Sequence, residues 1–255
     1  MVTIDSTRLD KIIADFAMLI ADTGLKNAVI GLSGGIDSAL ACNLAIKAIG
    51  CEHVFTYNMP SATSSQASYE DSALVAKHLG VAFETISIAG IAQAYPNFDL
   101  LSAHRKGNIC ARLRMLMLFD KAVEHDALVI GTGNKSEAML GYCTWYGDSA
   151  CSINPLADMY KSQVYQAAKL LGIPEKIINK APSADLYVGQ TDEEDFGYTY
   201  KELDRLLDEL VENGKSPEEA INAGFDRAFV ESVAERMNKY AFKRFLPKCI
   251  SIDQK

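Results

Sequence analysis

Short apolar runs and longer periodic segments alternate along the first half of the chain. Apolar runs typical of buried strands lie at residues 28–30, 53–57, 81–88 and 128–131. Apolar residues recur at the three- and four-residue spacing of helices in the ranges 4–20, 39–50, 68–79 and 108–124. Strands that alternate with helices predict a parallel sheet with helices on both of its faces. We therefore expect an α/β fold.

The second half of the chain is predicted to be mainly helical. Periodic segments at residues 161–171, 200–211 and 226–245 predict three helices, and residues 216–219 form a capping box with proline at the first helical position. Residues 182–197 are polar and predict a loop, with the acidic run 192–195 in solvent. No repeat, low-complexity tract or linker divides the chain, so we expect residues 1–255 to form a single domain.

Composition narrows the classes of function. The chain has 255 residues, of which 49% are hydrophobic and 23% charged, as in a soluble globular domain. Its net charge of −8 and the lack of a basic stripe disfavour nucleic-acid binding. No apolar run is long enough to span a membrane or to form a signal peptide. Six cysteines without a C-x-x-C pair indicate reduced thiols, so we expect a cytoplasmic protein.

A glycine-rich stretch joins the first predicted strand to the helix that follows. It reads Gly31-Leu32-Ser33-Gly34-Gly35-Ile36-Asp37-Ser38. The start of a helix presents backbone N–H groups and a positive dipole end to anions, and glycines let the backbone approach a phosphate closely. Asp37 would repel a phosphate unless a cation such as Mg²⁺ lay between them. The stretch lacks the lysine of a Walker A loop. The alternative interpretation is a glycine turn with ordinary capping residues.

A second loop follows the fourth predicted strand. It begins Gly131-Thr132-Gly133, and because the carboxyl ends of parallel strands meet at one edge, we expect both loops to face one crevice. Thr132 could reach a nucleotide there. Glu137 lies at a helix start, where it either stabilises the helix dipole or joins Asp37 as a ligand of Mg²⁺. Lys161 also opens a helix, where a cation is disfavoured, which indicates that it faces an anion.

Aromatic and basic residues provide further candidate contacts. Residues 141–148 are rich in glycine and aromatic residues and contain Trp145, the single tryptophan. These rings could stack on a flat ligand ring or pack in the core. Arg112 and Arg114 lie two positions apart on a predicted helix, so at most one of them is expected to face a given ligand.

The motifs resemble those of a known enzyme family. SGGIDS resembles the PP-loop of the ATP pyrophosphatases, and SGGxDS alone is shared with GMP, asparagine and argininosuccinate synthetases and with tRNA-modifying enzymes. The more specific strings, in chain order, resemble the ammonia-dependent NAD synthetases: AxLRM from Ala111, GTGNKSE from Gly131, GYxTxYGD from Gly141, NPLxxxYK from Asn154, KAPSADL from Lys180, GQTDEEDFG from Gly189 and KRFLP from Lys243.

This resemblance implies a Rossmann-like fold of the adenine nucleotide alpha hydrolase type, with additional C-terminal helices, and a two-step ligase reaction. MgATP adenylates the nicotinate carboxylate of nicotinate adenine dinucleotide (deamido-NAD) and pyrophosphate leaves. Ammonia then converts the adenylate to NAD and AMP. By family match, ATP is bound by residues 31–38, Thr132, Lys161 and Ser183, and Mg²⁺ by Asp37 and Glu137. Asp37 and Lys161 are the expected catalytic residues.

The resemblance also implies how the second substrate binds. The residues at the matching positions for deamido-NAD are Arg112, Trp145, Ser152 and Lys243, and the family acts as a homodimer. Residues 182–197 are expected to close over the site. The chain departs from many members, which have Asp-His at Gly133-Asn134, lysine at Trp145, aspartate at Ser152 and histidine at Phe242. Since the sequence suggests no histidine partner for any cysteine, we expect ammonia rather than glutamine to supply the nitrogen.

Three other classes share part of the pattern. A tRNA-modifying adenylating enzyme would normally have a basic surface or paired cysteines. A GMP synthetase would bring an amidotransferase domain. A non-enzymatic nucleotide-binding protein related to the universal stress proteins would lack the strings around Glu137 and Lys161. An ATP pyrophosphatase activity that depends on deamido-NAD would separate the main interpretation from all three.

Overall fold

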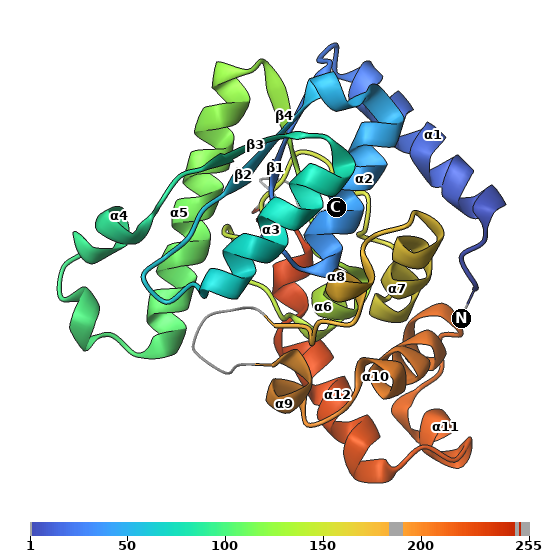
Figure 1. Ribbon diagram of the computed structural model, residues 1–255. Coiled ribbons are helices and arrows are strands. Elements are labelled where there is room, and N and C mark those ends of the chain that lie inside the picture. The colour runs from blue at the N-terminus through green and yellow to red at the C-terminus, as the bar shows by residue number, and fades with distance from the viewer. Residues whose placement is uncertain (1, 184–190, 248–249, 251–255) are drawn as a thin grey trace.

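The sheet of the computed structural model, which describes residues 2–183, 191–247 and 250, is parallel and has the strand order β3-β2-β1-β4 (Figure 1). The strands are β1 (Asn27–Gly31), β2 (Val54–Asn58), β3 (Ala82–Thr85) and β4 (Ala127–Ile130). β1 pairs with β2 on one side and with β4 on the other, so the loops that follow β1 and β4 leave the sheet next to each other. The parallel sheet predicted from the alternation of elements is confirmed.

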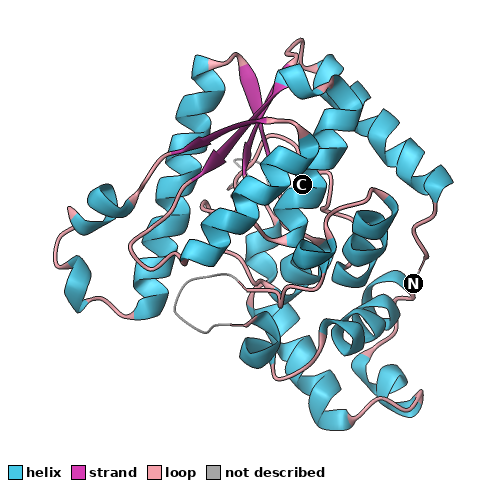
Figure 2. Cartoon of the chain, in the orientation of Figure 1, coloured by secondary structure: helices cyan, strands magenta, loops and turns pink. Residues whose placement is uncertain are grey.

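Helices cover both faces of the sheet (Figure 2). α2 (Ile36–Ile49) packs on β1 and β2, with α1 (Ser6–Asp22), α3 (Gln66–Leu79) and α7 (Lys161–Leu170) on the same side. α4 (Ala89–Gln93) and α5 (Ala103–Glu124) lie on the opposite side, where α5 packs on β1 and β4. The middle of β1 is fully buried, as expected for a strand covered on both faces.

α2 is buried nearly all round, because it lies between the sheet and two other helices. Every residue from 38 to 45 is buried, and the small side chains Ala39, Ala41 and Ala45 let neighbouring elements approach closely. A helix that is apolar on all sides must lie in a protein interior. The helix that begins at the glycine loop is thus fixed on all sides by the core.

A second helical layer forms the C-terminal part of the chain, below the sheet in Figure 1. Its core contains Leu203, Leu206 and Val230 together with Leu140 of α6 (Lys135–Leu140), and its helices pack against α6 and α7. The remaining elements are α8 (Glu175–Ile178), α9 (Asp192–Phe196), α10 (Tyr200–Leu207), α11 (Pro217–Asn222) and α12 (Arg227–Lys239), with short turns of helix at Cys51–His53, Phe98–Leu100, Asp208–Glu212 and Ala241–Arg244.

Four predictions about local structure are wrong. The predicted strand 81–88 is limited to Ala82–Thr85, and the predicted helix 226–245 ends at Lys239, before a separate short turn of helix. The predicted helix 108–124 begins at Ala103, because the Ser102 side chain accepts a hydrogen bond from Arg105 N and caps a polar first turn. The acidic run 192–195 is not a solvated loop. It forms the first turn of α9, and Asp192 is buried.

Residues 184–190, which belong to the predicted closing loop 182–197, lie outside the described residues. Among the described residues, no helix combines the length and apolar character needed to cross a bilayer.

Candidate active site

The glycine loop after β1 lies directly against α3. Gly34 has a φ of +79°, and a Cβ built there would lie 2.7 Å from Ser68 O and 2.9 Å from Ser72 N. A side chain therefore fits neither the backbone conformation nor the space. Gly35 is the N-cap of α2 and has no side chain with which to cap that first turn. The side chains of Leu32 and Ile36 are buried, so a ligand at this loop would meet only their backbone.

Asp71 holds α3 next to this loop through two ion pairs. Its buried carboxylate pairs with Lys176 and Lys180, each at 2.7 Å. Burial alone would raise the pKa of Asp71, but the two ammonium groups outweigh it and hold that pKa below its ordinary value. Asp71 therefore links α3 to the segment that leads to Ser183, an exposed residue at the end of the described range.

The two serine hydroxyls of the loop bind within the loop itself. The Oγ atoms of Ser33 and Ser38 are 3.0 Å apart, and Ser38 Oγ also donates to Gly35 O at 3.0 Å. Ser33 N donates to Ser38 Oγ at 3.2 Å. These bonds fix the curvature of the loop.

The loops after β1 and β4 meet α7 at a cluster of charged side chains. Lys161 Nζ lies 2.5 Å from Asp37 Oδ2 and 3.6 Å from Glu137 Oε1, and its side chain is only 2% exposed. Asn134 Nδ2 donates to Asp37 Oδ1 at 2.9 Å, which ties the second loop to the first. The structure thus brings together three residues that lie up to 124 positions apart in the sequence.

Asn134 and Glu137 also cap α6 reciprocally. Asn134 Oδ1 accepts from Glu137 N at 3.0 Å, and Glu137 Oε2 accepts from Asn134 N at 3.1 Å. This capping box fixes the Glu137 side chain at the helix start. The two interpretations of Glu137 are therefore compatible, because one carboxylate oxygen caps the helix while the other faces Lys161.

The cluster carries one more negative than positive charge when all three groups are ionised. Burial and the nearby Asp37 carboxylate raise the pKa of Glu137 to about 8. Burial disfavours the charged form of Lys161, but Asp37 and Glu137 outweigh this and raise its pKa above the ordinary value. Lys161 is therefore an ammonium at neutral pH. In their ionised forms, two carboxylates that face a single cation form a donor set of the kind that binds Mg²⁺.

Sequence reasoning missed three residues at this cluster. Asn134 carries a local signal, the Asn-x-x-Glu capping pattern, which indicates its place at the start of α6. The Tyr200 ring lies 5.2 Å from Lys161 Nζ, and its hydroxyl donates to Asp192 at 3.0 Å. The local hydrophobic and polar pattern indicates neither Tyr200 nor Asp192 as a site residue, because both reach the cluster by tertiary folding. Thr132, by contrast, lies half-buried at the carboxyl end of β4, where the sequence places it.

A second group of predicted residues gathers around the segment 141–148. Arg112 donates to Trp145 O at 3.1 Å, and Lys243 Nζ donates to Gly141 O at 2.8 Å and Cys143 O at 2.7 Å. Trp145 is half-buried, stacks on Tyr146 at 4.6 Å between ring centroids and meets the edge of the Phe242 ring at 5.3 Å. It therefore lies outside the hydrophobic core.

The other two predicted positions lie apart from this group. Arg114 points elsewhere and donates to Met59 O at 3.0 Å, so the two arginines of α5 diverge as expected. Ser152 lies beyond the segment 141–148, where its Oγ accepts from Val129 N of β4 at 3.2 Å.

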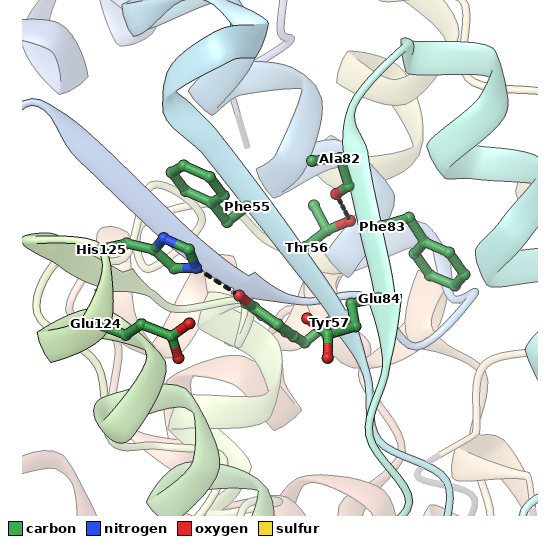
Figure 3. Close-up of a pocket in the computed structure, with 8 residues that line it drawn as sticks. All are labelled: Phe55, Thr56, Tyr57, Ala82, Phe83, Glu84, Glu124 and His125. Atoms are coloured by element: carbon green, nitrogen blue, oxygen red, sulfur yellow. Dashed lines mark hydrogen bonds between the residues drawn. The ribbon is translucent and has the colours of Figure 1, made fainter.

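A shallow hollow of about 190 Å³ lies elsewhere, beside β2, β3 and the end of α5 (Figure 3). The His125 ring stacks on Phe55 at 3.9 Å, and His125 Nε2 lies 2.7 Å from the Tyr57 hydroxyl. His125 precedes β4, at the strand end opposite to the loop with Thr132. This hollow is thus separate from the charged cluster.

Comparisons with known proteins agree with the motifs. The family model for NAD synthase matches residues 9–247. The NH(3)-dependent NAD(+) synthetase of Trichlorobacter lovleyi is 46% identical over 225 residues, which cover 88% of this chain and 82% of that protein. The protein of the same name from Methanococcoides burtonii is 40% identical over 254 residues, covering 98% and 97%.

Two solved structures are similar over almost their whole length. NMN synthetase from Francisella tularensis has a TM-score of 0.85 and 34% identity, covering 96% of this chain and 97% of that one. The NH3-dependent NAD synthetase from Campylobacter jejuni has a TM-score of 0.81 and 33% identity, covering 98% and 100%. From the motifs, the fold and these matches together, the chain belongs to the NAD synthase family.

Proposed function

We propose that this chain is a ligase that converts deamido-NAD to NAD with ATP and ammonia. The observation that carries the proposal is the meeting of Asp37, Glu137 and Lys161 beside a glycine loop at the start of a helix. Membership of the NAD synthase family supports it, as do relatives named for dependence on ammonia. The tRNA-modifying alternative is not favoured by these relatives.

In the first step, a carboxylate oxygen of the nicotinate ring attacks the α-phosphorus of ATP. The bond from that phosphorus to the bridging oxygen breaks, and pyrophosphate leaves with the electron pair. We assign the phosphates to residues 31–38, and further ATP contacts to Thr132, Lys161 and Ser183. The Lys161 ammonium would stabilise the negative charge that develops on pyrophosphate, and its burial strengthens this effect.

We further propose that Asp37 and Glu137 would hold Mg²⁺. Among the described residues, no group of three or more histidine, cysteine, aspartate and glutamate side chains is arranged to hold a metal. Two carboxylates alone fit Mg²⁺ well, because this ion usually keeps water and phosphate oxygens as its other ligands. When bound, it would neutralise phosphate charge.

In the second step, the ammonia nitrogen attacks the carbonyl carbon of the adenylate. A carbon–nitrogen bond forms, the bond from that carbon to the AMP oxygen breaks, and one proton leaves the nitrogen. We assign deamido-NAD to Arg112, Trp145, Ser152 and Lys243. The partly exposed Trp145 ring offers a flat surface for stacking, and the two cations suit a pyrophosphate.

We also propose a homodimer. The apolar residues Leu116, Phe119 and Val123 of α5 follow helical spacing and are 55%, 38% and 81% exposed. Met18 and Leu19 of α1 are exposed as well, and a symmetric contact would bury such surfaces. We expect light scattering at micromolar concentration to give twice the chain mass, and a monomer alone would contradict this proposal.

Consumption of ATP and the free thiols are typical of a cytoplasmic enzyme.

A direct assay tests the proposed reaction. The purified chain is given MgATP and deamido-NAD with an ammonium salt or with glutamine freed of ammonia, and NAD, AMP and pyrophosphate are measured. We expect all three products with ammonium, and little NAD with glutamine. A further arm replaces deamido-NAD by nicotinate mononucleotide, because one structural relative is an NMN synthetase. Release of pyrophosphate that does not depend on deamido-NAD would refute the proposal.

A further inference from the structure

The first turn of α7, which carries Lys161, is held by side chains from two other helices. Lys161 N donates to Ser136 Oγ of α6 at 2.9 Å, and Ser162 N donates to Asp204 Oδ2 of α10 at 2.7 Å. The first N–H groups of a helix lack partners within the helix and need acceptors from outside it. Here these acceptors come from residues 25 positions before Lys161 and 42 positions after Ser162.

Asp204 joins these contacts into one network. Its Oδ1 accepts from Ser136 Oγ at 2.5 Å, and its Oδ2 accepts from Ser162 Oγ at 2.5 Å as well as from the backbone of that residue. Asp204 is fully buried, and a buried carboxylate is tolerated only when it is hydrogen-bonded. A carboxylate suits the position because all three of its partners are donors.

The partners of Asp204 are the direct neighbours of two residues in the charged cluster. Ser136 precedes Glu137 at the start of α6, and Ser162 follows Lys161 at the start of α7. We propose that Asp204 is a positioning residue that fixes these two helix starts against each other, so that Glu137 and Lys161 face Asp37. It acts through Ser136 and Ser162. This inference rests on the proposed function for its effect on catalysis.

The test compares Asp204→Asn with a matched control, Glu212→Gln. Asparagine keeps the shape but replaces one acceptor by a donor. Glu212 accepts from Lys135 Nζ at 2.6 Å and from the Tyr160 hydroxyl at 2.9 Å. It thus also ties the C-terminal layer to α6 and to the residue before α7, but it does not bind the two amides in question. Both variants and the unchanged chain are measured for kcat, KM, unfolding midpoint and hydrogen exchange of the Lys161 and Ser162 amides.

We expect Asp204→Asn to lower kcat on the order of ten- to a hundredfold relative to Glu212→Gln, because a misplacement of about 1 Å can cost about a hundredfold. The KM for deamido-NAD should stay within about twofold, and exchange at the two amides should become faster. Equal kcat values for the two variants, both folded, would overturn the inference.

Two further results are also decisive. If Asp204→Asn does not fold, the same comparison is made with Ser162→Ala, which removes one hydroxyl bond to Asp204 and leaves the carboxylate in place. If the unchanged chain makes no NAD, the proposed function fails. Hydrogen exchange still tests the structural claim in that case, and unchanged protection of both amides in Asp204→Asn would overturn it.

Discussion

Replacement of Gly34 by alanine should test how closely α3 approaches the glycine loop. The new Cβ would lie 2.8 Å from Asp71 Cβ and at similar distances from two backbone atoms of α3. Neither α3 nor the loop can move freely, since Asp71 is held by two lysines and the loop by its own serines. Alanine must also adopt the positive φ of this position.

The loss of stability in Gly34→Ala has two contributions, the left-handed backbone conformation and the steric overlap with α3. A left-handed conformation costs a non-glycine residue about 1–2 kcal/mol, and overpacking in a fixed surrounding costs about 1–3 kcal/mol. Together they predict that Gly34→Ala lowers the free energy of unfolding by about 2–5 kcal/mol. For a chain of this size, this corresponds to a fall of about 4–20 °C in the unfolding midpoint.

Gly80→Ala serves as the matched control. Gly80 also has a positive φ, +67°, at the C-cap of α3, but no described atom lies within 4 Å of its added Cβ. Gly80→Ala should therefore lower the free energy of unfolding by only about 1–2 kcal/mol, which is the cost of the left-handed conformation alone. Urea unfolding of both variants measures the difference. Equal losses for Gly34→Ala and Gly80→Ala would show that α3 does not constrain the loop.

Four other predictions concern single side chains. Asp37→Asn should lower kcat on the order of a hundredfold or more and still unfold cooperatively, and near-normal turnover would refute its proposed role. Asp71 has a lowered pKa, so its stabilisation should be present at pH 7 and disappear as the pH falls through about 4 and below. Urea unfolding of Asp71→Asn should accordingly show a smaller free energy of unfolding than the unchanged chain at pH 7, and this difference should narrow as the pH falls below the ordinary carboxyl pKa of about 4. Arg112→Ala should raise the KM for deamido-NAD with little change in stability. Arg114→Ala should instead lower the unfolding midpoint, because Arg114 holds a backbone carbonyl.

The sequence predicts the sheet and the two loops well, because periodicity and glycine patterns are local. Each strand and the helix that follows it can be read from fewer than about twenty residues. The order of strands then places the loops after β1 and β4 together, since parallel strands end at one edge. The residues Asp37 and Glu137 could therefore be expected in one place before their distances were known.

The remainder of the candidate site depends on contacts between distant segments. Asp204 looks like one of several polar residues on an amphipathic helix, and only the fold reveals that it is buried between α6 and α7. The prediction of a solvated loop at Asp192 is wrong for a related reason. Acidic residues are usually exposed, but the Tyr200 hydroxyl donates a buried hydrogen bond to the Asp192 carboxylate. Burial of a polar residue is a property of the whole fold and leaves little trace in the local pattern.

The contact of Lys161 with both carboxylates has a consequence for the order in which ligands arrive. Asp37 and Glu137 share the Lys161 ammonium as a counterion that is covalently part of the chain, so its effective concentration does not fall with dilution. A free divalent cation must compete with this tethered ammonium. A cation that arrives already complexed to a nucleotide brings phosphates toward which the ammonium can turn. If Asp37 and Glu137 hold Mg²⁺ as proposed, binding of metal and nucleotide as one complex is favoured over binding of the metal first.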